Sequence, residues 1–193
     1  MMIYDFYSDI DKEVLINFAT NSTIGVSGIS EIKKLFLETK EHVIYEKSVK
    51  IQKASETQVL GSGNNFSKNL LLYSLLKICG YDCKLQYNFI KDNTGKICNK
   101  GLKVYPWFFV TINFFGSEIK LDCSFNREYM MAIGITYIGD MLDFKIENYI
   151  AKGEVIFTKQ SECQDVKDDK VIELVKTAGE YGIFSRNRGI SYV

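Results

Sequence analysis

The strongest pattern along the chain is an apolar run near its centre. From Phe66 to Cys79 apolar residues occupy most positions, and Gly80 follows directly. The run contains five leucines and an isoleucine: Leu70, Leu71, Leu72, Leu75, Leu76 and Ile78. Because these side chains would surround a helix rather than form one stripe on it, we expect the helix to be buried on most sides. Glycine after the last apolar residue is typical of a helix end. The pattern predicts a central helix.

Two amphipathic stretches precede this helix. Residues 9–20 have an acidic start and an apolar face at helical spacing, so they predict a first helix. A loop with two glycines follows at residues 21–30. A second helix is then expected through about Glu46, and Ser30 suits its N-cap.

The pattern changes to strands after Gly80. Residues 83–90 alternate apolar and polar side chains, which indicates a half-buried strand. Residues 104–115 are rich in aromatic and β-branched residues, and Gly116 and Ser117 form a short turn. Residues 118–123 then return as the antiparallel partner. The segment predicts a hairpin.

The remaining residues complete an α+β pattern. Strand character recurs at residues 134–137 and 154–158, and residues 165–178 have a helical pattern. Helices therefore precede an antiparallel sheet, on which the central buried helix packs. No repeat or proline-rich linker divides the chain, and Pro106 is its sole proline. We expect one domain with an N-terminal helical segment (1–30), a core (31–125) and a C-terminal α/β extension (126–193), where residues such as Met130, Met131, Ile133 and Ile135 supply apolar surface.

Composition narrows the classes of partner. Hydrophobic residues make up 46% and charged residues 25% of the 193 residues, which is typical of a globular protein. Lys plus Arg and Asp plus Glu both total 24, so no net charge attracts nucleic acid or an anionic membrane. Arg186 and Arg188 are interpreted as solubilising charges. We expect neither a nucleic-acid nor a membrane partner.

The N-terminus and the apolar runs bear on localisation. Residues 1–12 carry three aspartates and no basic segment leading into a long apolar run, unlike a secretory signal. No apolar run reaches the roughly 20 residues that a membrane helix needs. We expect a cytoplasmic protein.

The cysteines and the single histidine offer little metal chemistry. The five cysteines are an odd number without a CxxC pair: Cys79, Cys83, Cys98, Cys123 and Cys163. Reduced, mostly buried thiols are the simplest interpretation. His42, the only imidazole, lies in a predicted helix without an evident carboxylate partner and is expected to be structural. We expect no metal and no cofactor.

A set of short motifs surrounds the central helix. Ala54-Ser55-Glu56-Thr57 is followed by the turn Gly61-Ser62-Gly63-Asn64-Asn65, the leucine-rich helix and Gly80-Tyr81-Asp82. This order resembles the transglutaminase-like superfamily, the papain-related group that includes bacterial transglutaminase-like proteins and peptide N-glycanases. The two glycines lack the lysine of a phosphate-binding loop, which argues against nucleotide binding.

The resemblance implies that the position of the catalytic cysteine is taken by Asn65. A thiol at a helix N-terminus is activated by the helix dipole and by unpaired N–H groups, which lower its pKa. A neutral carboxamide is neither a good nucleophile nor ionisable, although it is a favoured N-cap. Asn65 therefore favours stability over reactivity at this position.

The resemblance also implies positions for the base and the acid. The family opens its next strand with H-x-W and follows with D-x-[ST], which here match Tyr105-Pro106-Trp107 and Asp122-Cys123-Ser124. Because the unperturbed pKa of a tyrosine is about 10, Tyr105 would be a poor general base. Asp122 is retained, and Trp107 and Asn64 would line the cleft. Trp107 suits the core better than a cleft wall, and Asp122 equally suits a strand end or a bond to Tyr105.

Two classes of function remain open. The first is a pseudoenzyme of this superfamily that binds a peptide or another protein. The second is an active cysteine peptidase, deamidase or transamidase with a relocated nucleophile, Cys83 or Cys123, and His42 as its base. The sequence identifies neither a ligand nor an oligomeric state.

Overall fold

A computed structural model describes residues 3–48, 50–92, 105–132, 155–157, 164–166, 170 and 172–175. Some predictions lie outside the described residues: the strand at 134–137, and the side chains of Cys98, Ile133, Ile135, Cys163, Arg186 and Arg188. Of Tyr105, only the backbone is described.

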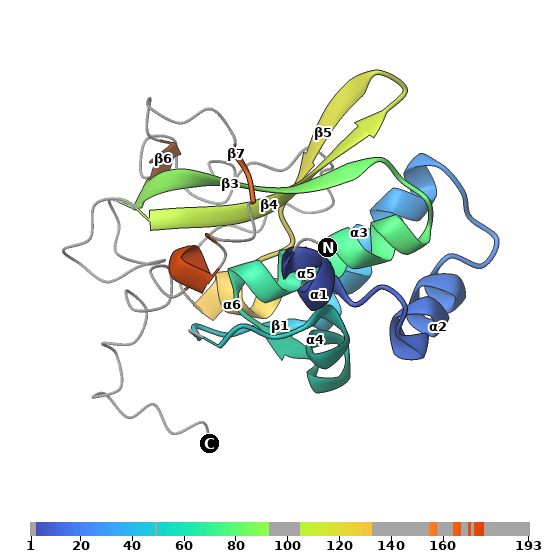
Figure 1. The fold of residues 1–193 in the computed structure, drawn as a ribbon, viewed down its shortest axis with the longest axis horizontal. Helices are drawn as coiled ribbons and strands as arrows, with labels where there is room; N and C mark the ends of the chain where they lie inside the picture. Colours follow the sequence, from blue (N-terminus) through green and yellow to red (C-terminus); the bar gives the residue numbers. More distant parts are fainter. Residues whose placement is uncertain are drawn as a thin grey trace.

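The described elements form an α+β fold in which helices cover one face of an antiparallel sheet (Figure 1), as the sequence predicts. The helices are α1 (Ile3–Ser8), α2 (Glu13–Ser22), α3 (Ile29–His42), α4 (Ala54–Leu60), α5 (Asn65–Ile78) and α6 (Arg127–Ala132). The strands are β1 (Ile44–Tyr45), β2 (Ser62–Gly63), β3 (Cys83–Asp92), β4 (Tyr105–Phe114), β5 (Ser117–Leu121), β6 (Val155–Phe157) and β7 (Gln164–Asp165).

The sheet is built around the long strands β3 and β4. Its order is β5-β4-β3-β6, all antiparallel, and β7 pairs with β3 farther along the same edge as β6. A separate parallel pair, β1 and β2, joins the segment that follows α3 to the turn before α5. This pair fixes the chain on both sides of α4.

Helix α5 is the central buried helix that the apolar run predicts. It contacts β3 and β4 on one side and α3 and α4 on another. Its apolar side chains Leu70, Leu71, Leu72, Leu75 and Leu76 are 0% exposed. Each buried leucine contributes about 1.5–3 kcal/mol to folding. The hydrophobic core therefore lies along this helix.

The ends of α5 are set by local hydrogen bonds. The Asn64 side chain is the N-cap, because its Oδ1 accepts the Ser67 N–H at 2.9 Å. At the other end Gly80 adopts a φ of +83°, and the Tyr81 N–H donates to the Leu76 carbonyl. The predicted bounds, 66–79, are thus shifted by one residue.

Two N-terminal predictions are wrong in detail. The first predicted helix starts later, at Glu13, because Asp9 has a positive φ and its carboxylate accepts bonds from Ser55. The second starts at the N-cap Gly28 rather than Ser30, and it ends at His42 rather than Glu46 because the chain then pairs as β1.

Differences also occur beyond β3. The tight turn of the hairpin consists of Phe115 and Gly116, so Ser117 already pairs with Phe114. Strand β6 confirms the strand expected near 154–158. Asp165 belongs to β7, and the described helical residues of the last predicted helix are 170 and 172–175. None of the helices in the described ranges is long and apolar enough to cross a membrane.

Candidate functional site

The first residue of α5 joins this helix to the middle of β4. The Nδ2 of Asn65 donates to the Phe108 carbonyl at 2.9 Å, and its Oδ1 accepts the Phe108 N–H at 2.7 Å. Nδ2 also lies 2.6 Å from the Ser124 Oγ. Asn65 is 7% exposed. Its amide therefore pairs with a strand residue and does not cap the helix, a role that belongs to Asn64.

Asn69, one helical turn later, extends this contact. Its Nδ2 lies within 3.1 Å of the Phe108 carbonyl and of the Ser124 Oγ, and 3.4 Å from the Asp122 Oδ1. Its Oδ1 accepts the Cys123 N–H at 3.2 Å. Two amides on one face of α5 thus tie the helix to β4 and to residues 122–124.

The Asp122 carboxylate lies at the end of this network and is 2% exposed. Its Oδ2 accepts the Trp107 indole N–H at 2.7 Å, and its Oδ1 accepts the N–H and the hydroxyl of Ser124. Burial raises the pKa of Asp122, whereas the hydrogen bonds from Ser124 and Trp107 act in the opposite direction. These partners are donors, which is what an ionised carboxylate requires.

Trp107 is one of the described side chains that meet Asp122, together with Ser124 and Asn69. Trp107 and Asp122 are 15 positions apart across the hairpin. In a catalytic triad the acid accepts the N–H of an imidazole, and here an indole N–H occupies that geometry. An indole is a donor only and has no basic nitrogen to accept a proton. Tyr105 lies at the start of β4, where its backbone is opposite Ile90.

An aromatic cluster packs beside Trp107. Its ring centroid is 5.2 Å from that of Phe125, which in turn lies 4.8 Å from Tyr45 and 5.1 Å from Tyr129. Trp107 is 2% exposed. It therefore behaves as a core residue with a satisfied N–H.

The last predicted site residue, Asn64, closes the start of α5. Besides capping the helix, its Nδ2 donates to the carbonyls of Ser48 and Lys50 at 2.8 and 3.0 Å. Asn64 is 7% exposed. The structure thus brings Asn65, Trp107 and Asp122 into one buried network with Asn64 beside it, and their assignment to a triad and a cleft stays a prediction.

The sequence patterns did not predict the polar stripe to which these residues belong. Asn65, Lys68 and Asn69 follow helical spacing in the first turns of α5, whose later residues are mostly apolar. Lys68 is 0% exposed, and its Nζ donates to the carbonyls of Lys40, at 2.9 Å, and Val43 at the end of α3. Burial lowers its pKa from 10.5 to about 8. Polar residues at i, i+3 and i+4 were the available signal.

The described thiols are poorly suited to nucleophilic attack. Burial raises the pKa of Cys83 to about 12 and that of Cys79 to about 11, and it also raises the pKa of Cys123. Because the thiolate is the reactive form, such thiols are inert near neutral pH. Cys123 is fully buried and its Sγ lies 3.3 Å from the Lys68 carbonyl.

His42 lies at the exposed end of α3. Its side chain is 73% exposed, and its Nε2 is 3.2 Å from the Glu38 carboxylate on the preceding turn. The expectation that it lacks a carboxylate partner is therefore wrong. Within the described ranges, no group of three or more His, Cys, Asp or Glu side chains is placed to hold a metal ion.

Comparison with known proteins finds similarity in structure and not in sequence. No family model matches the chain, and no curated protein matches it. The fold is similar to that of a proposed cysteine protease from Cytophaga hutchinsonii, with a TM-score of 0.50 and 14% identity over 83% of this chain and 53% of that one. A proposed protease from Parabacteroides distasonis gives a TM-score of 0.40 and 10% identity over 63% of this chain and 26% of that one. The chain thus spans about half the length of the first protein, and the likeness shows the fold alone.

Proposed function

We propose that this chain is a transglutaminase-like protein without cysteine-enzyme chemistry, and that it acts by binding a peptide or another protein. The observation that carries the proposal is the commitment of the Asn65 amide to both backbone groups of Phe108. The resemblance puts the nucleophile at this position. Here the position serves to join α5 to β4.

The arrangement around Asp122 supports the same proposal. The cysteine mechanism needs a nucleophile, a base that accepts its proton and an acid that orients the base. Among the described residues, the Trp107 indole and Ser124 donate to the Asp122 carboxylate, and neither is a base at neutral pH. Asn65, Trp107 and Asp122 are all at most 7% exposed, so a substrate would have to displace packed side chains to reach them. Binding is therefore expected at the surface.

The alternative is an active enzyme with a relocated nucleophile. Burial keeps Cys83 and Cys123 protonated near neutral pH, and His42 is paired with Glu38. This alternative therefore depends on Cys98 or Cys163, which lie outside the described residues.

The proposal is tested by assays of peptide hydrolysis and of amine incorporation. We expect no turnover by the wild-type chain and none by a variant that lacks all five cysteines. Turnover that survives in the cysteine-free variant but is abolished by Asn65→Ala would contradict the proposal. Asn17→Ala is the matched control, because Asn17 is an exposed amide on α2. Turnover that disappears with Cys98→Ser or Cys163→Ser would support the alternative instead.

A further inference from the structure

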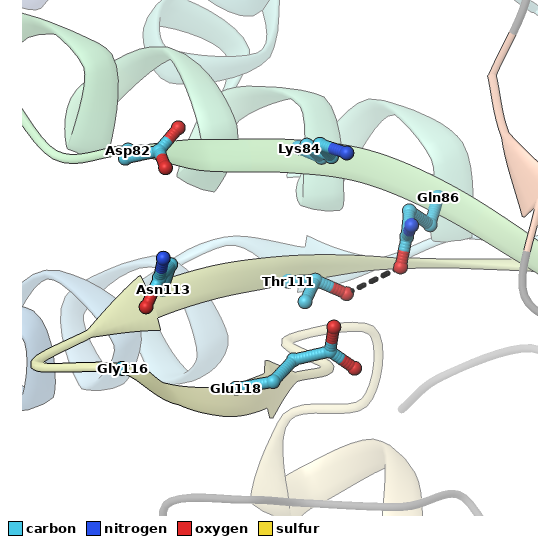
Figure 2. Close-up of a pocket in the computed structure, with 7 residues that line it drawn as sticks. All are labelled: Asp82, Lys84, Gln86, Thr111, Asn113, Gly116 and Glu118. Atoms are coloured by element: carbon cyan, nitrogen blue, oxygen red, sulfur yellow. Dashed lines mark hydrogen bonds between the residues drawn. The ribbon is translucent and has the colours of Figure 1, made fainter.

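The outer face of the sheet holds a polar cavity of about 360 Å³. Figure 2 shows its lining side chains on β3, β4 and β5 and at Asp82 just before β3, with helices behind the sheet. Six side chains line it: Asp82, Lys84, Gln86, Thr111, Asn113 and Glu118. They alternate along the strands with core residues such as Cys83, Leu85 and Ile112. The cavity is therefore on the face turned away from α5.

The strand register orders the charges of this cavity into two rows. Asn113 lies opposite Glu118, and its backbone N–H donates to the Asp82 carbonyl. The first row across the strands therefore consists of the Asp82 carboxylate, the Asn113 amide and the Glu118 carboxylate. In the next row Thr111 lies between Lys84 and Lys120. The row nearer the hairpin tip is thus acidic.

The second row is already compensated by neighbouring groups. Lys84 is 3.7 Å from Asp165, and Lys120 is 3.8 Å from Glu118. The Thr111 hydroxyl donates to Gln86 at 2.6 Å. Counting Asp82, Glu118 and Asp165 against the two lysines leaves one net negative charge. No described salt bridge engages the Asp82 carboxylate, so it is available to a cation.

The hairpin tip beside the cavity carries a second unusual feature. Phe115 has a φ of +50° and is 94% exposed, and the next residue, Gly116, lines the cavity. Positive φ is strained for a bulky residue, and hairpin turns of two residues favour asparagine or glycine there. The Phe115 ring contacts that of Phe114 edge to face, with centroids 4.6 Å apart, and is otherwise open to solvent. Strain of this kind points to a contact made outside the chain.

We infer that the cavity binds an arginine side chain from an extended segment of a protein partner, with Phe115 contacting an apolar residue beside it. This inference rests on the proposed function as a binding module. The planar guanidinium matches a row of two carboxylates and an amide, because it offers several donors in one plane. The net negative charge of the cavity is complementary to it.

The test is a titration of the isotope-labelled full chain, followed by NMR, with the probe acetyl-Leu-Arg-Leu-amide. We expect saturable shifts of the backbone amides of Lys84, Thr111 and Asn113. Asp82→Asn and Glu118→Gln should each weaken binding by about tenfold, as expected for the loss of one charge-assisted hydrogen bond. Both side chains are exposed, so neither change should disturb folding.

Three controls make the test specific. Asp11→Asn removes an exposed carboxylate near the start of α2 and should bind like the wild type. Acetyl-Leu-Gln-Leu-amide should bind much more weakly. Phe115→Asn should weaken binding while raising the midpoint of thermal unfolding, because it removes the backbone strain.

The contrary results are equally distinct. Equal binding of the Gln and Arg peptides, or an equal effect of Asp11→Asn and Asp82→Asn, would overturn the inference. Absence of binding without turnover would overturn the assigned cavity and leave the proposed function in place. Turnover by the wild type that depends on Asn65 would overturn the proposed function and leave the binding result unaffected.

Discussion

Asn65 joins α5 to β4, because its side-chain amide forms the hydrogen bonds that a neighbouring strand would form with β4. Its removal leaves the buried Phe108 N–H without its acceptor. We therefore predict that Asn65→Ala lowers the free energy of unfolding by about 2–3 kcal/mol, measured by urea denaturation. Asn17→Ala on the exposed face of α2 should change it by less than about 0.5 kcal/mol. Similar losses in both variants would contradict a special role for Asn65.

Lys68 makes stability depend on pH in the alkaline range. Its pKa is about 8 in the folded chain and 10.5 in the reference state, so the unfolded chain binds more protons between these values. The contribution of Lys68 to stability is therefore lowest below pH 8 and rises up to about pH 10.5.

We predict that the stability difference between the wild type and Lys68→Met grows across this window by roughly 3 kcal/mol in favour of the wild type. Urea denaturation at a series of pH values measures this difference. Comparison with the variant is needed because Cys79 and Cys83 also titrate in this range. Their raised pKa values make the free energy of unfolding fall as the pH rises. A difference independent of pH would contradict the prediction.

For single residues, the sequence predicts their place in a local motif better than it predicts their contacts in the folded chain. Asn65 could be singled out because the turn and the helix around it are local motifs. Its partner Phe108 is 43 residues away, and no local pattern encodes such a pairing. The motif around Tyr105 spans only three residues, and its Trp107 binds Asp122 from a position 15 residues away.

At the scale of elements, the turn before α5 requires glycine twice, for different reasons. Gly61 has a φ of +64° and open space around it, whereas a Cβ at Gly63 would lie 3.0 Å from the Ser67 Cβ and 3.1 Å from the Thr57 Cγ2. We predict that Gly61→Ala costs about 1 kcal/mol and that Gly61→Asn recovers most of it, because asparagine tolerates positive φ.

At Gly63 the expected result is different. Crowding by neighbouring atoms costs about 1–3 kcal/mol, and asparagine is larger than alanine. Gly63→Asn should therefore be less stable than Gly63→Ala in thermal unfolding. If asparagine were more stable than alanine at both positions, backbone conformation alone would explain the need for glycine at Gly61 and Gly63.

The elements found from sequence are those with a long local signal. The apolar run and the alternation predict α5, β3 and the hairpin. Helix α4 has only seven residues, and β1 and β2 have two each. None of the three is long enough to show a periodic pattern of apolar residues. The end of α3 was overestimated because Val43 and Ile44 continue its apolar spacing, although the chain there turns to pair with β2.

At the scale of the whole molecule, protection of thiols reports on the intact fold. In a Cys98→Ser/Cys163→Ser background, we predict that Cys83 and Cys123 react with iodoacetamide only when the chain unfolds, because both are buried and their pKa values are raised. Cys79 is half-buried and should react first. Mass spectrometry along a urea gradient measures the rates. Fast labelling of Cys83 or Cys123 in the native chain would contradict this picture and favour a relocated nucleophile.

The overall architecture could be predicted because many residues contribute to it together. The α+β order depends on dozens of apolar positions, so single misplaced boundaries do not change it. The chemistry of the site depends on a few side chains, such as Trp107, Asp122 and Ser124, that meet only in the folded chain. For this reason the fold was predicted more completely than the site.

The amide of Asn65 also constrains how this sequence can change over evolutionary time. Asn65→Cys alone would leave the Phe108 N–H without an acceptor before any reaction became possible. Trp107→His alone would remove a large ring from the cluster around Phe125 without supplying a nucleophile. Under the proposed function, each single step would lose stability and supply no chemistry, so both changes would have to arise together. The hydrogen bonds that now join α5 to β4 therefore select against replacement of Asn65.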